Sequence, residues 1–304
     1  MLSGNHLQFD IIHAEGILKE DIEKPLESYE LLIVNNLANM SNAQIARLDA
    51  YVENGGKMLV TGMSSTRDAI GNPLHKVRLK SLGVEGDYTL HKLQRGTYFK
   101  ITEEDKDAFN YAGFEKLSLS YFNSDFLQCK LKDGATGHLK FIPQAMYGPP
   151  ERCYYDTVTE VPGLITNNYG KGKTVFIPWL IGELYDRKGH HSHDMIFMAS
   201  VLNLLDSQLE LKTDVSSLIE VNRMERRDGA FEFIGLINHS GQLGASFYEP
   251  LEIRDINFEL QVKGKVRNVK TLRKNENIAF KQRGNSVQLN IASLNDFEMV
   301  VVEY

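Results

Sequence analysis

The sequence is poor in the features that would assign it to several common classes of protein. It has only two cysteines, Cys129 and Cys153, among 304 residues, which is too few for a disulfide framework. No run reaches the ~18 apolar residues that a membrane span needs, and residues 1–10 lack the apolar core of a secretory signal. The formal net charge of −6 argues against nucleic acid or an anionic membrane as the main partner.

What is present fits an ordinary globular protein. Hydrophobic residues make up 42% and charged residues 24% of the chain, as is usual for soluble domains. A single core usually stops growing near ~250–300 residues, so we expect two domains. The two cysteines fit a reducing compartment, which favours the cytoplasm.

The clearest local pattern is a strand, a helix and a second strand in succession. The run Leu31–Val34 is typical of a parallel strand that is buried on both faces. Ser41 is predicted to cap the helix, with Gln44 completing a capping box. Gly55-Gly56 ends the helix, and Lys57–Thr61 forms the next strand. This unit predicts an α/β domain with a parallel sheet.

The rest of the first two hundred residues is predicted in less detail. Residues 9–18, FDIIHAEGIL, suit a buried strand that leads into a loop. Residues 163–179 predict a hairpin, followed by a helix with Ser192 as its cap and Asp194 in its first turn. Residues 63–162 are interpreted as an irregular, β-rich insertion around the sheet. Its β-prone pieces are residues 96–101, 116–122 and 126–131.

The pattern changes at about residue 207. Short strands then follow one another at regular intervals, separated by turn residues, which is typical of an all-β sandwich. We therefore place an α/β domain at residues 1–206 and a small β-sandwich domain at residues 207–304.

One loop contains a candidate nucleophile. Gly62-Met63-Ser64-Ser65-Thr66 resembles the nucleophile elbow G-x-S-x-G but lacks the final glycine, which allows the sharp turn to pack closely. A serine nucleophile also needs a histidine base nearby in space. We favour the interpretation that Ser64 and Ser65 satisfy backbone groups in a polar loop. A stand-alone hydrolase that uses Ser64 is the alternative.

The densest polar cluster, YDRKGHHSHD, contains possible metal ligands. His190, His193 and Asp194 would share one face of a helix, and all three are side chains that bind zinc or iron. Gly189 and Ser192, however, place the start of the helix inside the cluster. We therefore favour a polar loop that lines a cleft or a subunit contact. We expect no cofactor, and a metal-dependent hydrolase is kept as an alternative.

The residues just before this cluster form a candidate sugar or subunit contact. They are predicted to stand at the carboxyl edge of a strand, where open α/β sheets bind ligands. An aromatic ring can stack on a sugar, and carboxylates and an arginine can bind hydroxyl groups. The alternative is an aromatic core rim with surface ion pairs. With one histidine of the cluster, the candidates are Trp179, Glu183, Tyr185, Asp186, Arg187 and His190.

Three segments of the chain together carry a resemblance to a known family. They are FDIIHAEGIL, YELLIVNNLANMSNAQIARLDAYVENGGKMLVTGMSS and NYGKGKTVFIPWLIGELYDRKGHHSHDMIFMASVLNLL. They resemble the trimerisation domain of family 42 β-galactosidases and related glycoside hydrolases. That domain has a flavodoxin-type fold of the class I glutamine amidotransferase kind. The later INHSGQLGASFYEPLEIRDINFELQVKGKVRNV and DFEMVVVEY resemble the small β domain that ends such enzymes. The resemblance covers about residues 7–62 and 163–304.

The resemblance implies a non-catalytic module. In those hydrolases the catalytic glutamates lie in an upstream barrel of roughly 250 residues, and no such barrel precedes Phe9 here. In the amidotransferase fold proper the nucleophile is a cysteine on an elbow, and neither Cys129 nor Cys153 has that elbow sequence. We expect the C-terminal part of a longer hydrolase, or a relative without the barrel. The resemblance implies a homo-oligomer, with the trimer of that family as the candidate state and carbohydrate as a candidate ligand.

The resemblance also implies that the first strand of the sheet is missing. Unpaired backbone groups in a buried strand cost roughly 1–3 kcal/mol each. We therefore expect one of two arrangements. Either residues 9–13 close up beside residues 29–34, or the sheet borrows a strand from a partner chain.

Overall fold

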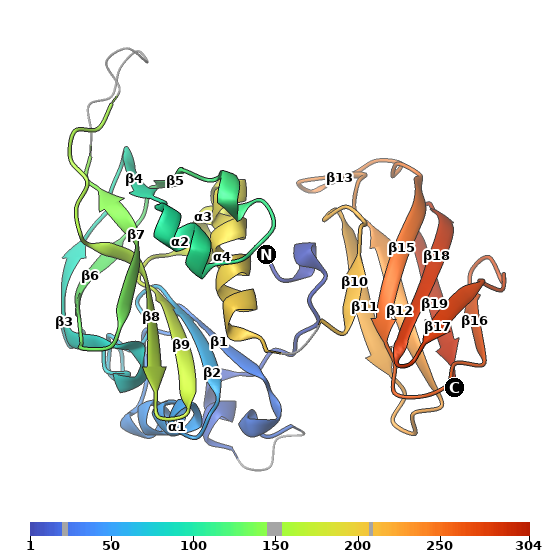
Figure 1. Cartoon of the computed structure of the whole chain (residues 1–304), viewed down its shortest axis with the longest axis horizontal. Helices are drawn as coiled ribbons and strands as arrows, with labels where there is room; N and C mark the ends of the chain where they lie inside the picture. The colour runs from blue at the N-terminus through green and yellow to red at the C-terminus, as the bar shows by residue number, and fades with distance from the viewer. Residues whose placement is uncertain (20–23, 145–153, 207–208) are drawn as a thin grey trace. The chain divides into compact units, whose positions relative to one another are not determined.

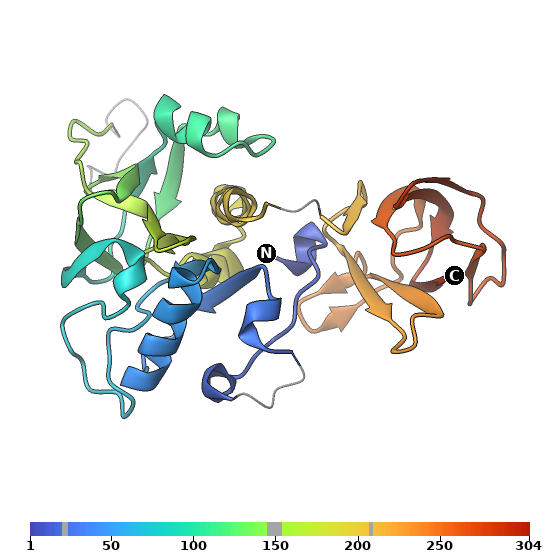
Figure 2. The ribbon, with the colours of Figure 1, turned by 60° about the horizontal axis from the view of Figure 1, so that its bottom comes forward.

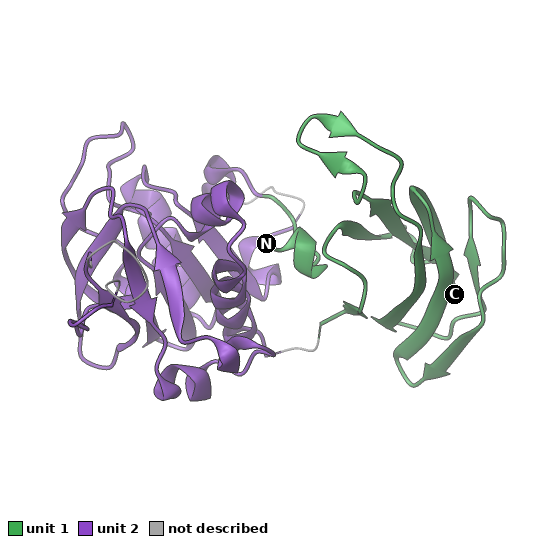
Figure 3. Ribbon diagram, turned by 90° about the horizontal axis from the view of Figure 1, so that it is seen from above, with its two compact units in different colours: residues 1–11, 207–304 green, residues 12–206 purple. Residues whose placement is uncertain are grey.

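The structure is a computed structural model that describes residues 1–19, 24–144, 154–206 and 209–304. It divides into two compact units, coloured separately in Figure 3. Residues 12–206 form an α/β unit, and residues 1–11 together with residues 207–304 form a β unit. Each unit is described by itself.

A seven-stranded mixed sheet forms the centre of the α/β unit (Figure 1). In order across the sheet, its strands are β1 (Leu31–Asn35), β2 (Lys57–Thr61), β9 (Gly172–Ile177), β8 (Pro162–Tyr169), β7 (Thr136–Ile142), β4 (Thr97–Lys100) and β5 (Leu119–Phe122). Only β1, β2 and β9 run parallel. The other neighbours are antiparallel.

The prediction of a parallel sheet is therefore correct only for three strands. The predicted hairpin of residues 163–179 is confirmed as β8 and β9, and it reverses the strand direction at this point. Strands from residues 63–162 then extend the same sheet through β7, β4 and β5, so these residues do not merely surround it. A separate pair, β3 (Val84–His91) and β6 (Phe126–Leu131), lies outside it.

Helices cover both faces of the parallel strands. Helix α1 (Asn42–Glu53) has the predicted capping box of Ser41 and Gln44, and its Leu48 shares a buried cluster with Val60 of β2. Helix α4 (His191–Leu204) also packs on β2 and β9. Figure 2 shows α1 (blue) and α4 (yellow) on opposite sides of the sheet. This arrangement buries both faces of β2. The prediction that residues 31–34 are buried on both faces is wrong, because Leu32 and Val34 are buried whereas Leu31 and Ile33 are only partly buried on this edge strand.

The remaining elements of this unit are short. Residues 96–101, 116–122 and 126–131 each contain a strand, as predicted. The other helices are α2 (Glu103–Ala108), α3 (Ile181–Lys188) and the 3₁₀ turns η2 (Ala14–Leu18), η3 (Leu26–Ser28), η4 (Lys80–Leu82) and η5 (Phe114–Lys116).

The prediction of a strand in residues 9–18 is wrong. Residues 9–13 pair with no strand, and η2 follows them. Ile12 packs against the core whereas Ile11 is 88% exposed, so the segment lacks the two buried faces of a central strand. Among the described residues β1 pairs only with β2 and is an edge strand. The sheet therefore does not close up with residues 9–13, and a strand borrowed from a partner chain stays a prediction.

The predicted cap of the last helix of this unit is also wrong. Helix α4 begins at His191, its N-cap residue is His190, and Ser192 already lies in the first turn. The Ser192 hydroxyl bonds the hydroxyl of Ser120 on β5 at 3.0 Å instead of bonding the helix backbone. The helix before it, α3, was not predicted, and Gly189 separates the two in a left-handed conformation.

Two antiparallel sheets make up the β unit (Figure 1). One has the order β10 (Leu211–Thr213), β15 (Ile253–Gln261), β18 (Ser286–Leu294) and β17 (Phe280–Arg283). The other has the order β11 (Ile219–Glu225), β12 (Phe231–Asn238), β19 (Phe297–Glu303) and β16 (Asn268–Thr271). A single buried cluster contains residues of both sheets, among them Phe258, Leu289 and Leu236. The predicted succession of short strands is confirmed. A small hairpin, β13 (Gln242–Leu243) and β14 (Ser246–Phe247), completes the unit.

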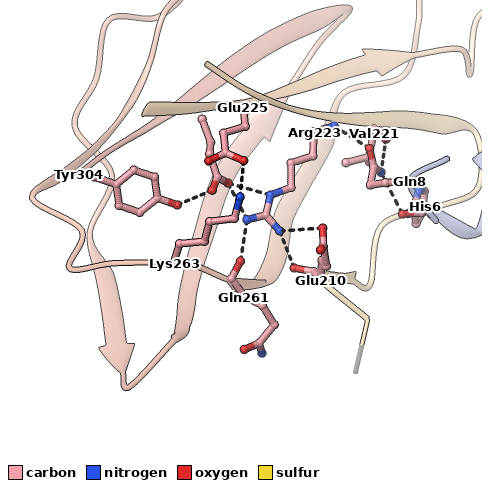
Figure 4. Close-up of polar contacts among 10 residues, drawn as sticks. His6, Gln8, Glu210, Val221, Arg223, Glu225, Gln261, Lys263 and Tyr304 are labelled. Carbon is pink, nitrogen blue, oxygen red and sulfur yellow. Dashed lines mark hydrogen bonds and ion pairs between the residues drawn. The ribbon is translucent and has the colours of Figure 1, made fainter. Parts of the chain in front are cut away.

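The N-terminal residues join this unit through side-chain contacts to strand backbone (Figure 4). After the 3₁₀ turn η1 (Ser3–Asn5), the Gln8 amide donates to the Val221 carbonyl at 3.0 Å and accepts from the Arg223 N–H at 2.7 Å. The His6 imidazole lies 3.1 Å from the Val215 carbonyl. The side-chain amide of Gln8 thus pairs with one backbone acceptor and one backbone donor on the outer edge of β11.

Candidate functional site

The carboxyl ends of β1, β2 and β9 are where an open α/β sheet would bind a ligand. Loops that bond one another close this edge. The Gly62 N–H lies 2.9 Å from the Ile177 carbonyl and 3.1 Å from the Trp179 carbonyl. The Asn36 side chain accepts a hydrogen bond from the Met63 N–H at 2.9 Å. The segments that follow the three parallel strands are therefore tied together.

Gly62 shows how tightly this edge is packed. Its φ is +63°, and an added Cβ would lie 2.5 Å from Asn36 Oδ1 and 2.9 Å from Leu180 Cδ2. Leu180 directly precedes α3, so the start of that helix lies against the loop after β2. A second glycine, Gly182, lies close to Asn35 at the end of β1. Protein side chains thus fill the space in which a ligand would contact Gly62.

Ser64 lies inside this packed loop. It is 0% exposed; its hydroxyl donates to the Thr61 carbonyl at 2.7 Å and accepts from the Leu37 N–H at 3.0 Å. None of the described histidines hydrogen-bonds to it. The neighbouring Ser65 hydroxyl accepts from the Arg78 N–H at 3.1 Å. Both serines satisfy backbone groups, which is the interpretation that the sequence favoured, and the geometry gives no support to Ser64 as a nucleophile.

Trp179 is a core residue. Its side chain is 0% exposed, and its indole N–H donates to the Gly163 carbonyl at 2.8 Å. One ring face stacks on Phe99, with centroids 5.2 Å apart, and the edges of Phe122 and His193 also contact it. The ring thus has the position that the alternative interpretation, an aromatic core, gives it, and the geometry gives no support to stacking on a sugar.

Of the other candidates, four lie on α3 and His190 is the N-cap residue of α4. Ile181 and Leu184 are the buried residues of α3, so Glu183, Asp186 and Arg187 are exposed. Glu183 and Arg187 form an ion pair of 2.9 Å, one helical turn apart. Such an exposed pair is solvated and contributes little to stability. These three side chains can make polar contacts, and their role in sugar or subunit contact stays a prediction.

Tyr185 lies between these exposed side chains and the core. It is half-buried, and burial, together with the nearby Asp194 charge, raises the pKa of its phenol. The phenol is therefore protonated at neutral pH and can serve as a hydrogen-bond donor. Its role in ligand or subunit contact also stays a prediction.

The polar cluster at the start of α4 does not form a metal centre. The rings of His190 and His193 lie 5.4 Å apart, and His190 also contacts Tyr121. His193 is buried, its Nε2 donates to the Tyr121 carbonyl at 2.6 Å, and burial lowers its pKa. Asp194 is buried in the first helical turn. Across residues 1–19, 24–144, 154–206 and 209–304, no group of three or more His, Cys, Asp or Glu side chains could hold a metal ion.

Cysteine chemistry has no support in the described part of the chain. Cys129 is buried on β6, and burial raises the pKa of its thiol to about 12. Such a thiol stays protonated at neutral pH and is a poor nucleophile. Cys153 lies outside the described residues.

A hydrogen-bonded series that the sequence analysis missed joins three separate elements. His138 on β7 lies 3.1 Å from the Asp105 carboxylate and 3.1 Å from the Thr166 hydroxyl. The order of the side chains, carboxylate, imidazole and hydroxyl, resembles that of a hydrolase triad. Asp105, however, also caps α2 by accepting from the Thr102 N–H at 2.8 Å, and it accepts from the Leu139 N–H. Although burial opposes it, the bonds from His138 and Thr102 hold the pKa of Asp105 below its usual value. The series therefore fastens α2 to β7 and β8. No local sequence pattern could have revealed it.

Comparisons with known proteins identify the fold. No family model matches the sequence, and no curated protein matches it. Among solved structures, α-L-fucosidase isoenzyme 2 from Paenibacillus thiaminolyticus aligns with 100% of this chain at a TM-score of 0.72 and 21% identity, over 44% of its own length. The GH42 β-galactosidase Gan42B from G. stearothermophilus aligns with 99% of this chain at a TM-score of 0.63 and 18% identity, over 34% of its own length. The β-galactosidase from Bacillus circulans sp. alkalophilus aligns with 100% of this chain at a TM-score of 0.59 and 14% identity, over 36% of its own length.

These similarities show a shared fold and a difference in length. Both units of this chain lie within the alignments, which cover 99–100% of it. The chain spans less than half the length of the glycoside hydrolases that it resembles. It is thus similar to a part of those enzymes.

None of the helices within the described ranges is long and apolar enough to cross a membrane.

Proposed function

We propose that this chain is a non-catalytic assembly module of a glycoside-hydrolase type of protein, with carbohydrate as its associated ligand. The observation that carries the proposal is the length relation: nearly the whole chain aligns with 34–44% of a fucosidase and a β-galactosidase. In this interpretation the α/β unit is a flavodoxin-type, amidotransferase-like domain, and the β unit is the sandwich that follows it.

The filled carboxyl edge of the sheet supports a role without chemistry. The Ser64 hydroxyl, at the position where an elbow would present a nucleophile, bonds two backbone groups. The Leu180 side chain lies against the same loop. A nucleophile must instead be accessible and activated by a base. We therefore do not propose a hydrolase that uses Ser64.

The edge strand β1 is the proposed assembly element. Among the described residues it pairs only with β2, and its Leu31 and Ile33 side chains are only partly buried. The N–H of Asn36 donates to Thr61 on β2. Successive N–H groups of a strand alternate in direction, so those of Ile33 and Asn35 point to the open side. An unprotected edge strand readily pairs with another chain.

Assembly predicts an oligomer in solution. The purified chain, of 34.5 kDa, is expected to sediment as a multiple of that mass, three times it for a trimer. Ile33→Pro removes an outward N–H and is expected to yield the monomer. Leu119→Pro, at the opposite edge of the sheet on β5, is the matched control and should keep the oligomer. Circular dichroism verifies that both variants fold. A wild-type chain that is monomeric at every concentration tested contradicts the proposal.

A further inference from the structure

A shallow groove lies on the outer face of the β10–β15–β18–β17 sheet, within the β unit. Its volume is about 620 Å³, within the range of roughly 300–1,000 Å³ that ligand sites occupy. The inner face of the same sheet contributes Ile256, Phe258, Leu260 and Leu289 to the buried core. Because side chains alternate between the two faces of a strand, the outer face presents the residues between them.

One row of these outer residues crosses all four strands. Lys212 on β10 is paired with Glu259 on β15, Glu259 with Gln288 on β18, and Gln288 with Lys281 on β17. All four line the groove. The row thus places a carboxylate and an amide between two lysines.

A second row lies two residues further along the strands. The Asn257 side chain donates to the Asp214 carboxylate at 2.7 Å, and its oxygen accepts from the Asn290 amide at 3.0 Å. Asp214 also accepts from the Asn257 backbone N–H at 3.0 Å. These bonds fix the orientation of both amides and hold the pKa of Asp214 below its usual value. The side-chain oxygen of Asn290, exposed in this row, has no protein partner among the described residues.

The charges of the groove select a neutral ligand. Two lysines face two carboxylates, Asp214 and Glu259, so the formal charges cancel. Neighbouring strands lie about 4.8 Å apart, which places the backbones of the two lysines, three strands apart, at roughly 14 Å. The Glu259 carboxylate lies between the two lysines in this row and would repel a phosphate or carboxylate bound there, so the groove does not suit a small anion.

We propose that this groove binds a neutral oligosaccharide. Vicinal hydroxyl groups each donate and accept, and they match two rows that together present amides, carboxylates and lysines. A groove that is open along the sheet suits a chain of sugars better than one enclosed ring. The exposed Ala279 adds apolar surface at the β17 end. The proposal goes beyond assembly and can fail while the assembly role stands, because binding and mass are measured separately.

Saturation-transfer NMR with galactotetraose and cellotetraose tests the site on the full chain. We expect transfer to at least one of these tetrasaccharides, and about tenfold weaker binding by the Asn257→Ala/Asn290→Ala variant, which loses the exposed Asn290 oxygen and the amide that orients it. Asn222→Ala, an exposed asparagine on β11 of the other sheet, is the matched control and should bind as the wild type does.

Three results would overturn the proposal. The first is the absence of transfer to either tetrasaccharide up to the solubility of the sugars. The second is equal binding by the wild type and the double variant, once circular dichroism shows that the variant is folded. The third is competition by sodium phosphate at constant ionic strength, because it would indicate an anion site.

Discussion

Replacing Arg223 with alanine is expected to lower the free energy of unfolding of the β unit by about 3–5 kcal/mol. The Arg223 guanidinium forms an ion pair with Glu232 at 2.6 Å. It also donates to the carbonyls of Gln261 and Glu210 at 2.6 and 2.9 Å (Figure 4). The Arg223 side chain is 10% exposed and that of Glu232 only 2%. Removing the arginine leaves a buried carboxylate without its cation, which is the costly way to break such a pair.

Among the described residues, the side-chain hydrogen-bond partner that Glu232 would keep is a tyrosine. The Tyr304 hydroxyl donates to Glu232 at 2.5 Å. Burial and this carboxylate raise the pKa of Tyr304, so the phenol keeps its proton at neutral pH. One neutral donor cannot replace a guanidinium, and the cost of the Arg223→Ala change should therefore persist near pH 7.

Urea unfolding followed by circular dichroism measures this effect. Arg254→Ala is the matched control, because the ion pair of Arg254 with Glu252 is exposed, and no measurable change is expected. The double change Arg223→Met/Glu232→Met should recover much of the lost stability, because it removes both buried charges. An Arg223→Ala variant as stable as the Arg254→Ala variant would show that the pair is unimportant.

Replacing Trp179 with alanine is expected to cost the α/β unit about 3–5 kcal/mol, as is usual when a large aromatic side chain is removed from a core. The ring contacts Phe99, Phe122 and His193. Its N–H also satisfies the Gly163 carbonyl, which would lose its partner. Thermal unfolding of the variant measures the loss. Tyr154→Ala, a change at a 72% exposed ring of the same unit, should leave the midpoint nearly unchanged.

Fluorescence separates the core role of this residue from a role in sugar binding. The chain has a single tryptophan, so the indole emission reports on Trp179 alone. We expect weak quenching by acrylamide and no change of the emission on titration with either tetrasaccharide. Strong quenching, together with a Trp179→Ala variant that is as stable as wild type, would contradict its placement in the core.

Local patterns allowed part of the fold to be predicted from the sequence. The strand–helix–strand unit depends on contacts within a few residues, such as the bonds between Ser41 and Gln44. The alternation of the later strands is also local, and both predictions were correct. Residues 9–13 have the composition of a strand but form none. A strand also needs a neighbouring strand to pair with, and the composition of a segment does not show whether one is present.

The candidate site was harder to predict because its properties depend on distant residues. Trp179 looked available next to a strand end, but the rings that cover it come from residues 57 to 80 positions earlier in the chain. The burial of Ser64 likewise follows from the loops after β1 and β2. The Arg223 network and the two rows of the groove depend on strand register, which no single segment of the sequence defines.

The most direct test of the central claim is the reaction of the purified chain with a fluorophosphonate probe, read by mass spectrometry of the intact chain and of its peptides. We expect no adduct on Ser64, because its hydroxyl is buried and bonds to the Thr61 carbonyl and the Leu37 N–H. An adduct on Ser64 in the folded wild-type chain, lost when the chain is first unfolded in urea, would contradict it. That result would establish that Ser64 is an activated nucleophile at the carboxyl edge of the sheet, whereas in the structure its hydroxyl only bonds backbone groups.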